Sequence, residues 1–517
     1  SILVANRGEI ALRIMRTAQA MGIQTIAIYV EADKDAPHVR FADKAVLLPD
    51  GGYLDIDAVL DAAQKSNAGA IHPGYGFLSE NSEFAKRVIR EKIIWVGPSP
   101  KVISVMGDKL KAKELAIKAS VPTLPMTSDE KEVKKIGYPL LIKAAAGGGG
   151  KGMRVVTDKK DLQESLEGAK REALSGFGDE RVFIERYVEK SRHIEIQILG
   201  DSHGNVIHLG ERECSIQRRH QKIIEESPSP RITEEIRFAM GNAAVDLAKK
   251  IKYESAGTVE FLFDDKSGEF WFLEVNTRLQ VEHPVTEEVT GIDLVAEQIK
   301  IARGEELQYS QEDIEWTGSS IEARLYAENP NNDFLPETGK MFAYEQAEND
   351  FMTRWDSGVH KDSVIGTNFD PMLAKVISYG ETREDAARVL AKSLEDSHIG
   401  GVITNKDFLI ATLRSDEFLK GNTTTDFIER VKPPRVKNLT NDELNLALTA
   451  AAMWKQMRNR ISSDIAPYIP SGWTNGRLPN PNITFLLDGE EIFVEYKLIN
   501  KNKFLVFNSE VEVVNID

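Results

Sequence analysis

Between Phe270 and Glu282 polar and apolar residues alternate, a pattern that an extended strand accommodates and a helix does not. In a strand the polar side chains would share one face of a sheet. They are Glu274, Asn276, Arg278, Gln280 and Glu282, alternating with Leu273, Val275, Thr277, Leu279 and Val281. An antiparallel sheet with one solvated face would explain the row without any function. Two carboxylates, a carboxamide and a guanidinium side by side also predict a chemical site.

A preceding apolar strand carries one charge, Glu260, and a five-residue turn joins the two strands as a predicted hairpin. If Phe263 pairs with Glu269, then Glu260 lies opposite Phe272. Glu274 is then its diagonal neighbour, at the roughly 7–8 Å spacing of such pairs. Two carboxylates at that spacing can bind one hard cation, so we predict a metal site with the oxygen ligands that Mg²⁺ prefers.

The composition of the 517-residue chain excludes several classes of protein. Its 81 acidic and 65 basic residues give a net charge of −16, which argues against a nucleic-acid surface. Its single cysteine, Cys214, excludes an internal disulfide framework and multi-cysteine metal sites. No apolar run approaches the ~20 residues that span a bilayer, and we expect neither a membrane segment nor a signal peptide.

The order of predicted elements indicates several domains. Strands and helices alternate through the first hundred residues, which predicts a parallel sheet flanked by helices. Pro433 and Pro434 indicate a linker. Thr440 and Glu443 form a capping-box signature that opens a helix to about Arg460, with alternating β segments after it. The predicted domains are 1–112, 113–310, 311–435 and 436–517.

A glycine-rich loop between two apolar strands predicts a phosphate-binding lid. It contains Gly147–Gly150 and Gly152, and Lys143 ends the strand before it. Glycine lacks a Cβ, so the backbone amides can approach phosphate oxygens closely. A flexible linker is the alternative. The loop is neither a Walker A loop nor a Rossmann fingerprint, because no helix follows it.

Three further motifs are ambiguous on their own. Lys109 opens a predicted helix and would ordinarily be a solvated lysine. The run Cys214–Lys222 holds three full cations and a histidine, which fits a solvated face or an anion site equally. His72–Asn81 leaves a short strand and would face a ligand crevice in an α/β sheet, or be only a turn.

Together these segments resemble biotin carboxylase of the ATP-grasp family. The matching segments follow the family's order over roughly residues 1–435: Ala5–Ala11, His72–Asn81, Met106–Lys109, Gly147–Met153, Arg192–Gln197, Cys214–Lys222 and Glu274–Pro284. The resemblance implies an α/β and α+β multidomain fold. It comprises a Rossmann-like N-terminal domain, an ATP-grasp domain with a mobile glycine-rich lid at about 130–195, and a mixed C-terminal domain, followed by a helix and a small β-rich segment.

The resemblance also implies a two-step reaction and its cofactors. ATP and bicarbonate give ADP and carboxyphosphate, and biotin is then carboxylated at its ureido nitrogen. ATP and Mg²⁺ (or Mn²⁺) are implied, with biotin as a carrier-bound substrate that is not attached to this chain. A carboxylate must deprotonate bicarbonate, a poor nucleophile. Arg278 suits a planar anion such as bicarbonate.

Site residues carry over from the family by position. The ATP-contacting positions are Lys109, Lys143, Gly149, Gly150, Glu185, Arg186, Tyr187, Val188, His193 and His220, together with Glu260 and Glu274. The metal ligands are Glu260, Glu274 and Asn276, and the bicarbonate pocket contains Lys222, Arg278 and Val281. Glu282 is the implied base, and Arg278, Glu282 and Lys222 are the catalytic set. Arg354 is the implied biotin contact.

Two departures from the family pattern leave these positions intact. Ala146 stands where many relatives begin the glycine run, and Asn368-Phe369 replaces an expected Tyr-Tyr pair. Residues 436–517 resemble the region of acyl-CoA carboxylase α subunits that contacts the carboxyltransferase β subunit. No Ala-Met-Lys-Met biotinylation motif is present, so the biotin carrier is expected on a separate subunit or beyond Asp517.

We therefore hypothesise the biotin carboxylase subunit of an acetyl-CoA or propionyl-CoA carboxylase. Its expected partners are a biotin carboxyl carrier protein or domain and a carboxyltransferase β subunit, within a homo-oligomer. Its expected compartment is the cytoplasm, or the mitochondrial matrix in a eukaryote. The alternatives are the front end of a pyruvate carboxylase, an ATP-grasp ligase that joins a carboxylate to an amine, and a degenerate nucleotide-binding module without activity.

Overall fold

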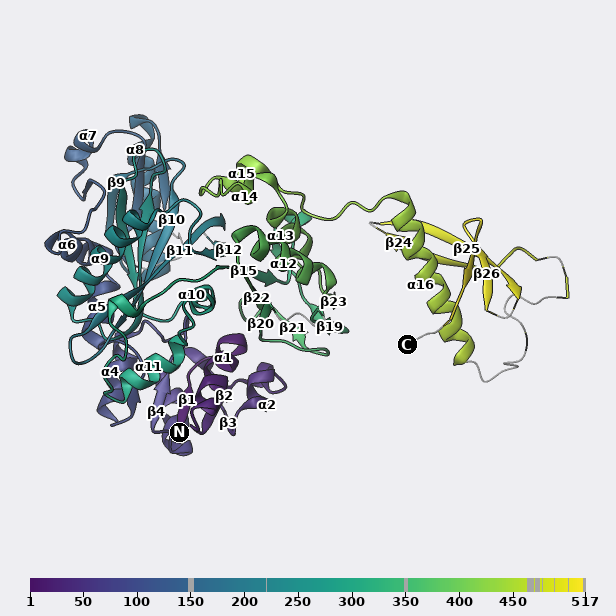
Figure 1. The fold of residues 1–517 in the computed structure, drawn as a ribbon, viewed down its shortest axis with the longest axis horizontal. Helices are drawn as coiled ribbons and strands as arrows, with labels where there is room; N and C mark the ends of the chain where they lie inside the picture. Colours follow the sequence, from purple (N-terminus) through teal and green to yellow (C-terminus); the bar gives the residue numbers. More distant parts are fainter. Residues whose placement is uncertain are drawn as a thin grey trace. The chain divides into compact units, whose positions relative to one another are not determined.

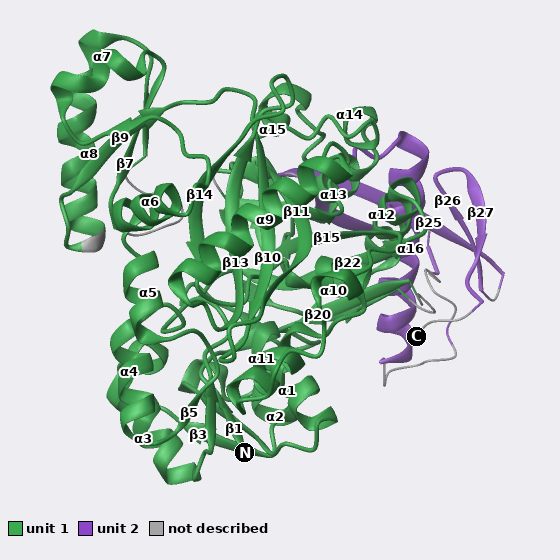
Figure 2. Ribbon diagram, turned by 60° about the vertical axis from the view of Figure 1, so that its left-hand side comes forward, with its two compact units in different colours: residues 1–436 green, residues 437–517 purple. Residues whose placement is uncertain are grey.

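The computed structural model describes residues 1–146, 153–219, 221–347, 352–462, 469, 475–476, 478–487, 489–500 and 502–514. The chain forms two compact units, Ser1–Val436 and Lys437–Asp517 (Figure 2). Within the described ranges, every helix is too short or too polar to cross a lipid bilayer.

Unit 1 opens with a five-stranded parallel sheet in the order β3-β2-β1-β4-β5 (Figure 1). Its strands are β1 (Ile2–Val4), β2 (Thr25–Tyr29), β3 (Lys44–Leu47), β4 (Ala70–His72) and β5 (Ile94–Trp95). The helices of this part are α1 (Gly8–Ala20), α2 (Pro37–Phe41), α3 (Ile56–Ser66), α4 (Ser82–Arg90) and α5 (Pro100–Met106). The parallel sheet predicted for the first hundred residues is confirmed.

The strand order of this sheet reverses between β1 and β4, the point at which open α/β sheets bind ligands. The loop after β1 contains Asn6, and the loop after β4 contains Gly74–Asn81. Asn6 Nδ2 donates to the carbonyl oxygens of Pro73 (2.9 Å) and Tyr75 (2.6 Å). The two predicted motifs are therefore fastened together at one edge of the sheet.

A second, four-stranded sheet has the order β6-β9-β7-β8 and is antiparallel. Its strands are β6 (Met126–Thr127), β7 (Leu140–Ala144), β8 (Arg154–Val156) and β9 (Val182–Arg186), with helices α7 (Val133–Ile136) and α8 (Leu162–Phe177). Helix α6 (Lys109–Lys118) precedes it. The predicted glycine loop joins β7 to β8, and its glycines lie outside the described residues.

The largest sheet has eight antiparallel strands in the order β14-β13-β10-β11-β12-β15-β22-β20. They are β10 (Arg192–Gly200), β11 (Val206–Arg218), β12 (Gln221–Ser227), β13 (Ser255–Phe263), β14 (Phe270–Asn276), β15 (Ser319–Tyr326), β20 (Thr353–Ser357) and β22 (Met372–Gly380). The sheet runs on across residue 310, where we predicted a domain boundary. That boundary stays a prediction.

The alternation along β10 shows how this sheet positions polar groups. Ile194, Ile196 and Ile198 are fully buried and share a core with helix α9 (Glu234–Ile251). The intervening side chains of β10 point to the opposite face. Helices α10 (His283–Thr290), α11 (Leu294–Ala302), α12 (Arg383–Asp396), α13 (Lys406–Leu413), α14 (Asp416–Leu419) and α15 (Phe427–Val431) complete the unit. Small paired strands are β16 (Glu328–Asn329), β17 (Leu335–Pro336), β18 (Gly339–Lys340), β19 (Ala343–Glu345), β21 (Val364–Ile365) and β23 (His398–Gly400).

Two predictions about the polar row are wrong. Strand β14 ends at Asn276, and residues 277–282 are irregular up to the start of α10. The hairpin pairs Phe263 with Phe270, and a bulge then puts Glu260 directly opposite Glu274. The bulge arises because Leu273 is an extra residue on β14, and an extra residue shifts the register beyond it.

Unit 2 consists of helix α16 (Asn441–Ile461) and a four-stranded antiparallel sheet. The strands are β24 (Asn482–Leu487), β25 (Glu490–Asn500), β26 (Lys503–Val506) and β27 (Ser509–Glu512). The predicted capping box is present, because Thr440 and Glu443 bond each other's backbone N–H reciprocally. Leu448, Ala452 and Met453 of the helix pack against the sheet in a small core. The predicted fold class is confirmed in all its parts.

Candidate functional site

Lys222, on β12, collects three carboxylates from three different segments. Its Nζ lies 2.6 Å from Glu195 Oε2, 3.0 Å from Glu260 Oε1 and 2.7 Å from Glu282 Oε1. All three carboxylates are buried. Burial alone would lower the pKa of Lys222, but the three negative charges outweigh it and raise that pKa well above its ordinary value. The lysine is therefore charged at every working pH.

Glu282, which precedes α10, is held between two cations. Arg324 of β15 donates from Nη2 to Glu282 Oε2 at 2.9 Å, and Lys222 holds the other oxygen. Burial would raise the pKa of Glu282, but Lys222, Arg324 and Arg212 outweigh it and lower that pKa far below its ordinary value. Glu282 is thus an ionised carboxylate ready to accept a proton, provided that an incoming acid shares its partners.

The three predicted metal ligands lie together on β13 and β14. Glu260 and Glu274 face each other across the paired strands, and Asn276 Nδ2 donates to Glu260 Oε1 at 2.8 Å. Side-chain cations neutralise both carboxylates, since Lys109 Nζ lies 2.9 Å from Glu274 Oε2 and His193 Nε2 lies 2.8 Å from Glu260 Oε2. Two carboxylates and an amide oxygen on adjacent strands are hard oxygen donors, and they fit a magnesium ion.

Among the predicted ATP-contacting residues, Lys143 and Glu185 meet in the four-stranded sheet. The Glu185 carboxylate is fully buried and forms ion pairs with Lys143 and with Lys113 of α6. Burial raises its pKa, but the two lysines outweigh it and lower the pKa to about 2. This carboxylate is therefore committed to orienting Lys143. Arg186 and Tyr187 follow it, and their N–H groups donate to the carbonyls of Pro125 (3.2 Å) and Pro139 (3.0 Å). Val188 comes next and is half-buried.

Arg278 is fixed from the N-terminal sheet. Its Nε donates to Glu80 Oε2 at 3.0 Å, and the neighbouring Thr277 donates its N–H to Glu80 Oε1 at 3.3 Å. Glu80 belongs to the loop after β4. The loop at the switch point thus meets the irregular segment 277–282, hereafter the catalytic segment, which carries Arg278, Val281 and Glu282.

Sequence reasoning missed five residues that build this site: Glu80, Lys113, Glu195, Arg212 and Arg324. A usable signal existed for two of them. Glu195 lies in the alternating run His193-Ile-Glu-Ile-Gln197, and Arg324 in Ser320-Ile-Glu-Ala-Arg324, with the same period of two as the polar row. Arg212 is fully buried, and its guanidinium contacts Glu195, Gln197 and Gln280. Gln280 therefore holds the catalytic segment to Arg212.

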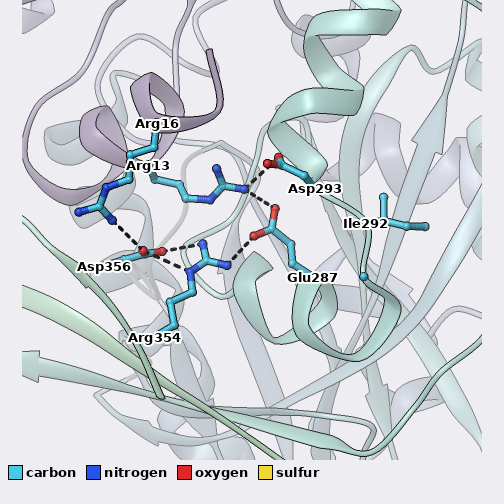
Figure 3. Close-up of a pocket in the computed structure, with 8 residues that line it drawn as sticks. Arg13, Arg16, Glu287, Ile292, Asp293, Arg354 and Asp356 are labelled. Atoms are coloured by element: carbon cyan, nitrogen blue, oxygen red, sulfur yellow. Dashed lines mark hydrogen bonds and ion pairs between the residues drawn. The ribbon is translucent and has the colours of Figure 1, made fainter. Parts of the chain in front are cut away.

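Arg354, the predicted biotin contact, lies elsewhere in the described structure. It lines a separate cavity of about 420 Å³ with Arg13 and Arg16 of α1 (Figure 3). The carboxylates there are Glu287, Asp293 and Asp356. Arg354 Nη2 lies 2.8 Å from Asp356 Oδ2, and its Nη1 lies 2.9 Å from Glu287 Oε2. The guanidinium groups are matched by carboxylates, so the cavity has no unbalanced positive charge for a phosphate.

Three predicted site residues, Gly149, Gly150 and His220, lie outside the described residues. The rest divide into a carboxylate–cation cluster around Lys222, the pair Lys109–Glu274 beside it, the Lys143–Glu185 pair, and Arg354 in its separate cavity. The cluster combines an ionised base, a cation shared by three carboxylates and a set of metal donors. Such a group can deprotonate an acid while neutralising charge on a transferring phosphoryl group.

Three family models match successive parts of the chain. The biotin carboxylase N-terminal domain matches residues 1–103, the carbamoyl-phosphate synthase L chain ATP-binding domain matches residues 108–310, and the biotin carboxylase C-terminal domain matches residues 322–430.

Among curated proteins, the chain is similar to biotin carboxylase 2 of Bacillus subtilis (46% identity, 83% of this chain, 99% of the relative). It is also similar to the mitochondrial methylcrotonoyl-CoA carboxylase subunit alpha of Dictyostelium discoideum (46% identity, 90% of this chain, 68% of the relative). The human mitochondrial propionyl-CoA carboxylase alpha chain is 47% identical over 87% of this chain, which spans 64% of that relative.

Solved structures agree. The biotin carboxylase domain of Hydrogenobacter thermophilus 2-oxoglutarate carboxylase, in complex with MgADP, ADP and bicarbonate, has a TM-score of 0.81 and 44% identity, covering 83% of this chain and 97% of that chain. Pyruvate carboxylase of Rhizobium etli has a TM-score of 0.82 and 40% identity, covering 87% of this chain and 42% of that chain.

Proposed function

This chain belongs to the biotin carboxylase family, and from that premise we propose that it is the biotin-carboxylating subunit of an acyl-CoA carboxylase. Its reaction is the ATP-dependent carboxylation of biotin with bicarbonate. The observation that carries the proposal is the convergence of Lys222 and Arg324 on Glu282, beside Arg278. That arrangement joins a proton acceptor to the cations that bicarbonate and a departing phosphate require.

In the first step a bicarbonate oxygen attacks the γ-phosphoryl group of ATP, which gives carboxyphosphate and releases ADP. Glu282 accepts the bicarbonate proton, and Arg278 and Lys222 hold the planar anion, with Val281 lining the pocket. Once bicarbonate shares Lys222 and Arg324, the basicity of Glu282 rises, because each cation then divides its charge between two anions. Mg²⁺, held by Glu260, Glu274 and Asn276, supplies charge neutralisation of the nucleotide phosphates.

In the second step the ureido nitrogen of biotin loses its proton and bonds the carboxyl carbon, and phosphate leaves. Arg278 stabilises the anion that the ureido group becomes, and Arg354 contacts biotin in the family-based assignment. Lys109, Lys143, the segment Glu185–Val188, His193, His220 and the lid glycines Gly149 and Gly150 hold ATP. A closed lid keeps water from hydrolysing carboxyphosphate.

Membership of an acyl-CoA carboxylase rests on the residues after Val436. The match to the methylcrotonoyl-CoA carboxylase subunit covers 90% of this chain, more than the 436 residues of unit 1 supply. The match to biotin carboxylase 2 covers 83%. The pyruvate carboxylase reading keeps one supporting observation, the likeness to the R. etli enzyme over 87% of this chain. We favour acetyl-CoA or propionyl-CoA as the final acceptor.

The same reasoning proposes the partners, compartment and domain limits. They are a biotin carrier protein or domain, a carboxyltransferase β subunit contacted by unit 2, and a second copy of this chain. The compartment is the cytoplasm or, in a eukaryote, the mitochondrial matrix. We keep the domain limits at residues 112, 310 and 435.

The test is ADP release and carboxybiotin formation by the purified chain with ATP, Mg²⁺, bicarbonate and free biotin. We expect ADP release to depend on both bicarbonate and biotin, and to be abolished in Glu282→Gln. Exposed Glu417→Gln, far from the cluster in sequence and paired only with surface groups, is the matched control. No carboxybiotin and no biotin-dependent ADP from a folded, ATP-binding chain would refute the proposal. Product formation from an amine without biotin would favour the ligase alternative.

A further inference from the structure

Lys375 of β22 is a fully buried lysine for which the proposed chemistry has no use. Its side chain has a relative exposure of 0%. Burying an ammonium group is costly unless every proton finds a partner, so such a residue needs a specific reason. Its Nζ donates to the carbonyl oxygen of Val281 at 2.8 Å and lies 3.4 Å from Glu9 Oε2 and 3.9 Å from Asp356 Oδ2.

The carbonyl that Lys375 binds belongs to the peptide between Val281 and Glu282. This peptide lies in the catalytic segment, where β14 has ended and α10 has not begun, so no strand or helix bonds hold it. A buried carbonyl outside regular structure must find its partner elsewhere. Lys375 supplies that partner from the far side of the sheet, and a fixed peptide plane fixes the starting direction of the Glu282 side chain.

The other end of the contact reaches the N-terminal sheet. Glu9 of α1 binds Lys375 with one carboxylate oxygen and the hydroxyl of Tyr75 with the other. Tyr75 lies in the loop after β4, whose Glu80 binds Thr277 and Arg278. The Glu9–Lys375 pair therefore touches both the loop and the catalytic segment, and Glu80 links the same two pieces a second time.

We propose that Glu9 and Lys375 are positioning residues that lock the catalytic segment against the loop after β4, and so set the approach of Arg278 and Glu282 to the substrate. This inference rests on the proposed function. Neither residue touches a reacting atom in this scheme. The competing explanation is an ion pair that contributes only to stability, as many buried pairs do.

The two explanations differ in what a double variant does. Lys375→Met removes the tether and leaves Glu9 as an uncompensated buried charge, so it loses both positioning and stability. Adding Glu9→Gln removes that charge while keeping a group able to bind the Tyr75 hydroxyl. We expect the double variant to recover most of the lost melting temperature and none of the lost turnover.

The experiment compares wild type, K375M, E9Q/K375M and the control K392M, an exposed lysine paired with Asp396 on α12. We expect K375M to lower kcat for biotin carboxylation about 10–100-fold and to raise KM for bicarbonate, as displaced supporting groups do. The dissociation constant of ATP should stay within about twofold, because the nucleotide residues lie on other segments. Amide hydrogen exchange over 277–282 should quicken in both tether variants, without substrate.

Several outcomes would overturn the inference: unchanged turnover in K375M, recovery of turnover together with stability in E9Q/K375M, or unchanged exchange over 277–282. Equal losses in kcat and ATP affinity would also overturn it. If wild type lacks biotin-dependent turnover, the proposed function fails separately, and the exchange measurement then decides the tether alone.

Discussion

Arg324 acts on the reaction through the charge of Glu282. It lies 2.9 Å from that carboxylate and is one of three cations that lower its pKa. Replacing it by methionine leaves Glu282 with Lys222 and Arg212, so the pKa of Glu282 rises. The acid limb of the pH profile of kcat/KM for bicarbonate should then move to higher pH, with about 10–100-fold lower activity at neutral pH.

Arg324→Lys keeps the charge but loses the planar fork, and should move the limb less. The surface variant Arg388→Met serves as the control, since Arg388 is 71% exposed. A limb that stays in place in Arg324→Met would show that Glu282 is not the group whose ionisation the profile reports.

Glu9 should give the stability of the chain a measurable pH dependence. Burial raises its pKa to about 7, although Lys375 and Arg354 pull it down, while Asp356 adds to the rise. Tyr75 also faces it. The folded chain therefore holds an extra proton between about pH 4.5 and 7, and stability falls as the pH rises through that window. Wild type should lose up to about 3 kcal/mol that Glu9→Gln does not lose.

The measurement is the urea denaturation of wild type and Glu9→Gln at pH 5 and pH 8. The difference in unfolding free energy between the two chains should favour wild type less at pH 8 than at pH 5. Parallel pH dependence in both chains would place the raised pKa on another group.

At the scale of elements, the period-two pattern predicted part of the site and not the rest. It placed Glu274 and Asn276 on β14 because a strand does form there. It extended the strand to Glu282, since the alternation continues although the partner strand β13 does not. The bulge at Leu273 could not be predicted either, because register depends on which residues of the opposite strand pack against it.

The buried charges were harder to predict for another reason. Arg324 and Glu195 lie in strands whose alternation is as regular as that of the polar row, yet alternation alone reads equally as a solvated face. What makes both residues internal is the sheet order, which puts β10, β12 and β15 close together, and order is a property of the whole fold. The family resemblance supplied most of the remaining residues.

Helix α16 offers a test of local structure. Thr440 caps its start by accepting from the Glu443 N–H, and Glu443 returns the bond to the Thr440 N–H. Thr440→Ala should destabilise the helix start by about 1 kcal/mol. Hydrogen exchange at the first turn of α16 should quicken accordingly, while Thr440→Ser should restore the wild-type rate. Quickened exchange in unit 1 as well would mean that the effect is not local.

At the scale of the whole molecule, every proposed site residue lies at or before Arg354, and unit 1 ends at Val436. A chain that stops at Val436 should carboxylate free biotin within about threefold of the full chain, since a compact unit with its own core folds by itself. It should fail to retain a carboxyltransferase subunit in a pull-down that the full chain passes. Loss of free-biotin turnover in a folded truncated chain would show that unit 2 takes part in the chemistry.

The eight-stranded sheet also sets a timetable for the newborn chain. Roughly ninety residues separate Glu282 from Lys375, so at about 5–20 residues per second the ribosome makes the acids some 5–20 seconds before their last buried cation. During that interval β12 has no β15 beside it, and Glu282 has neither Arg324 nor a tethered peptide. The half-made sheet therefore presents an open edge with unmatched negative charge, a stage at which a chaperone that shields nascent β-strands has the most to protect.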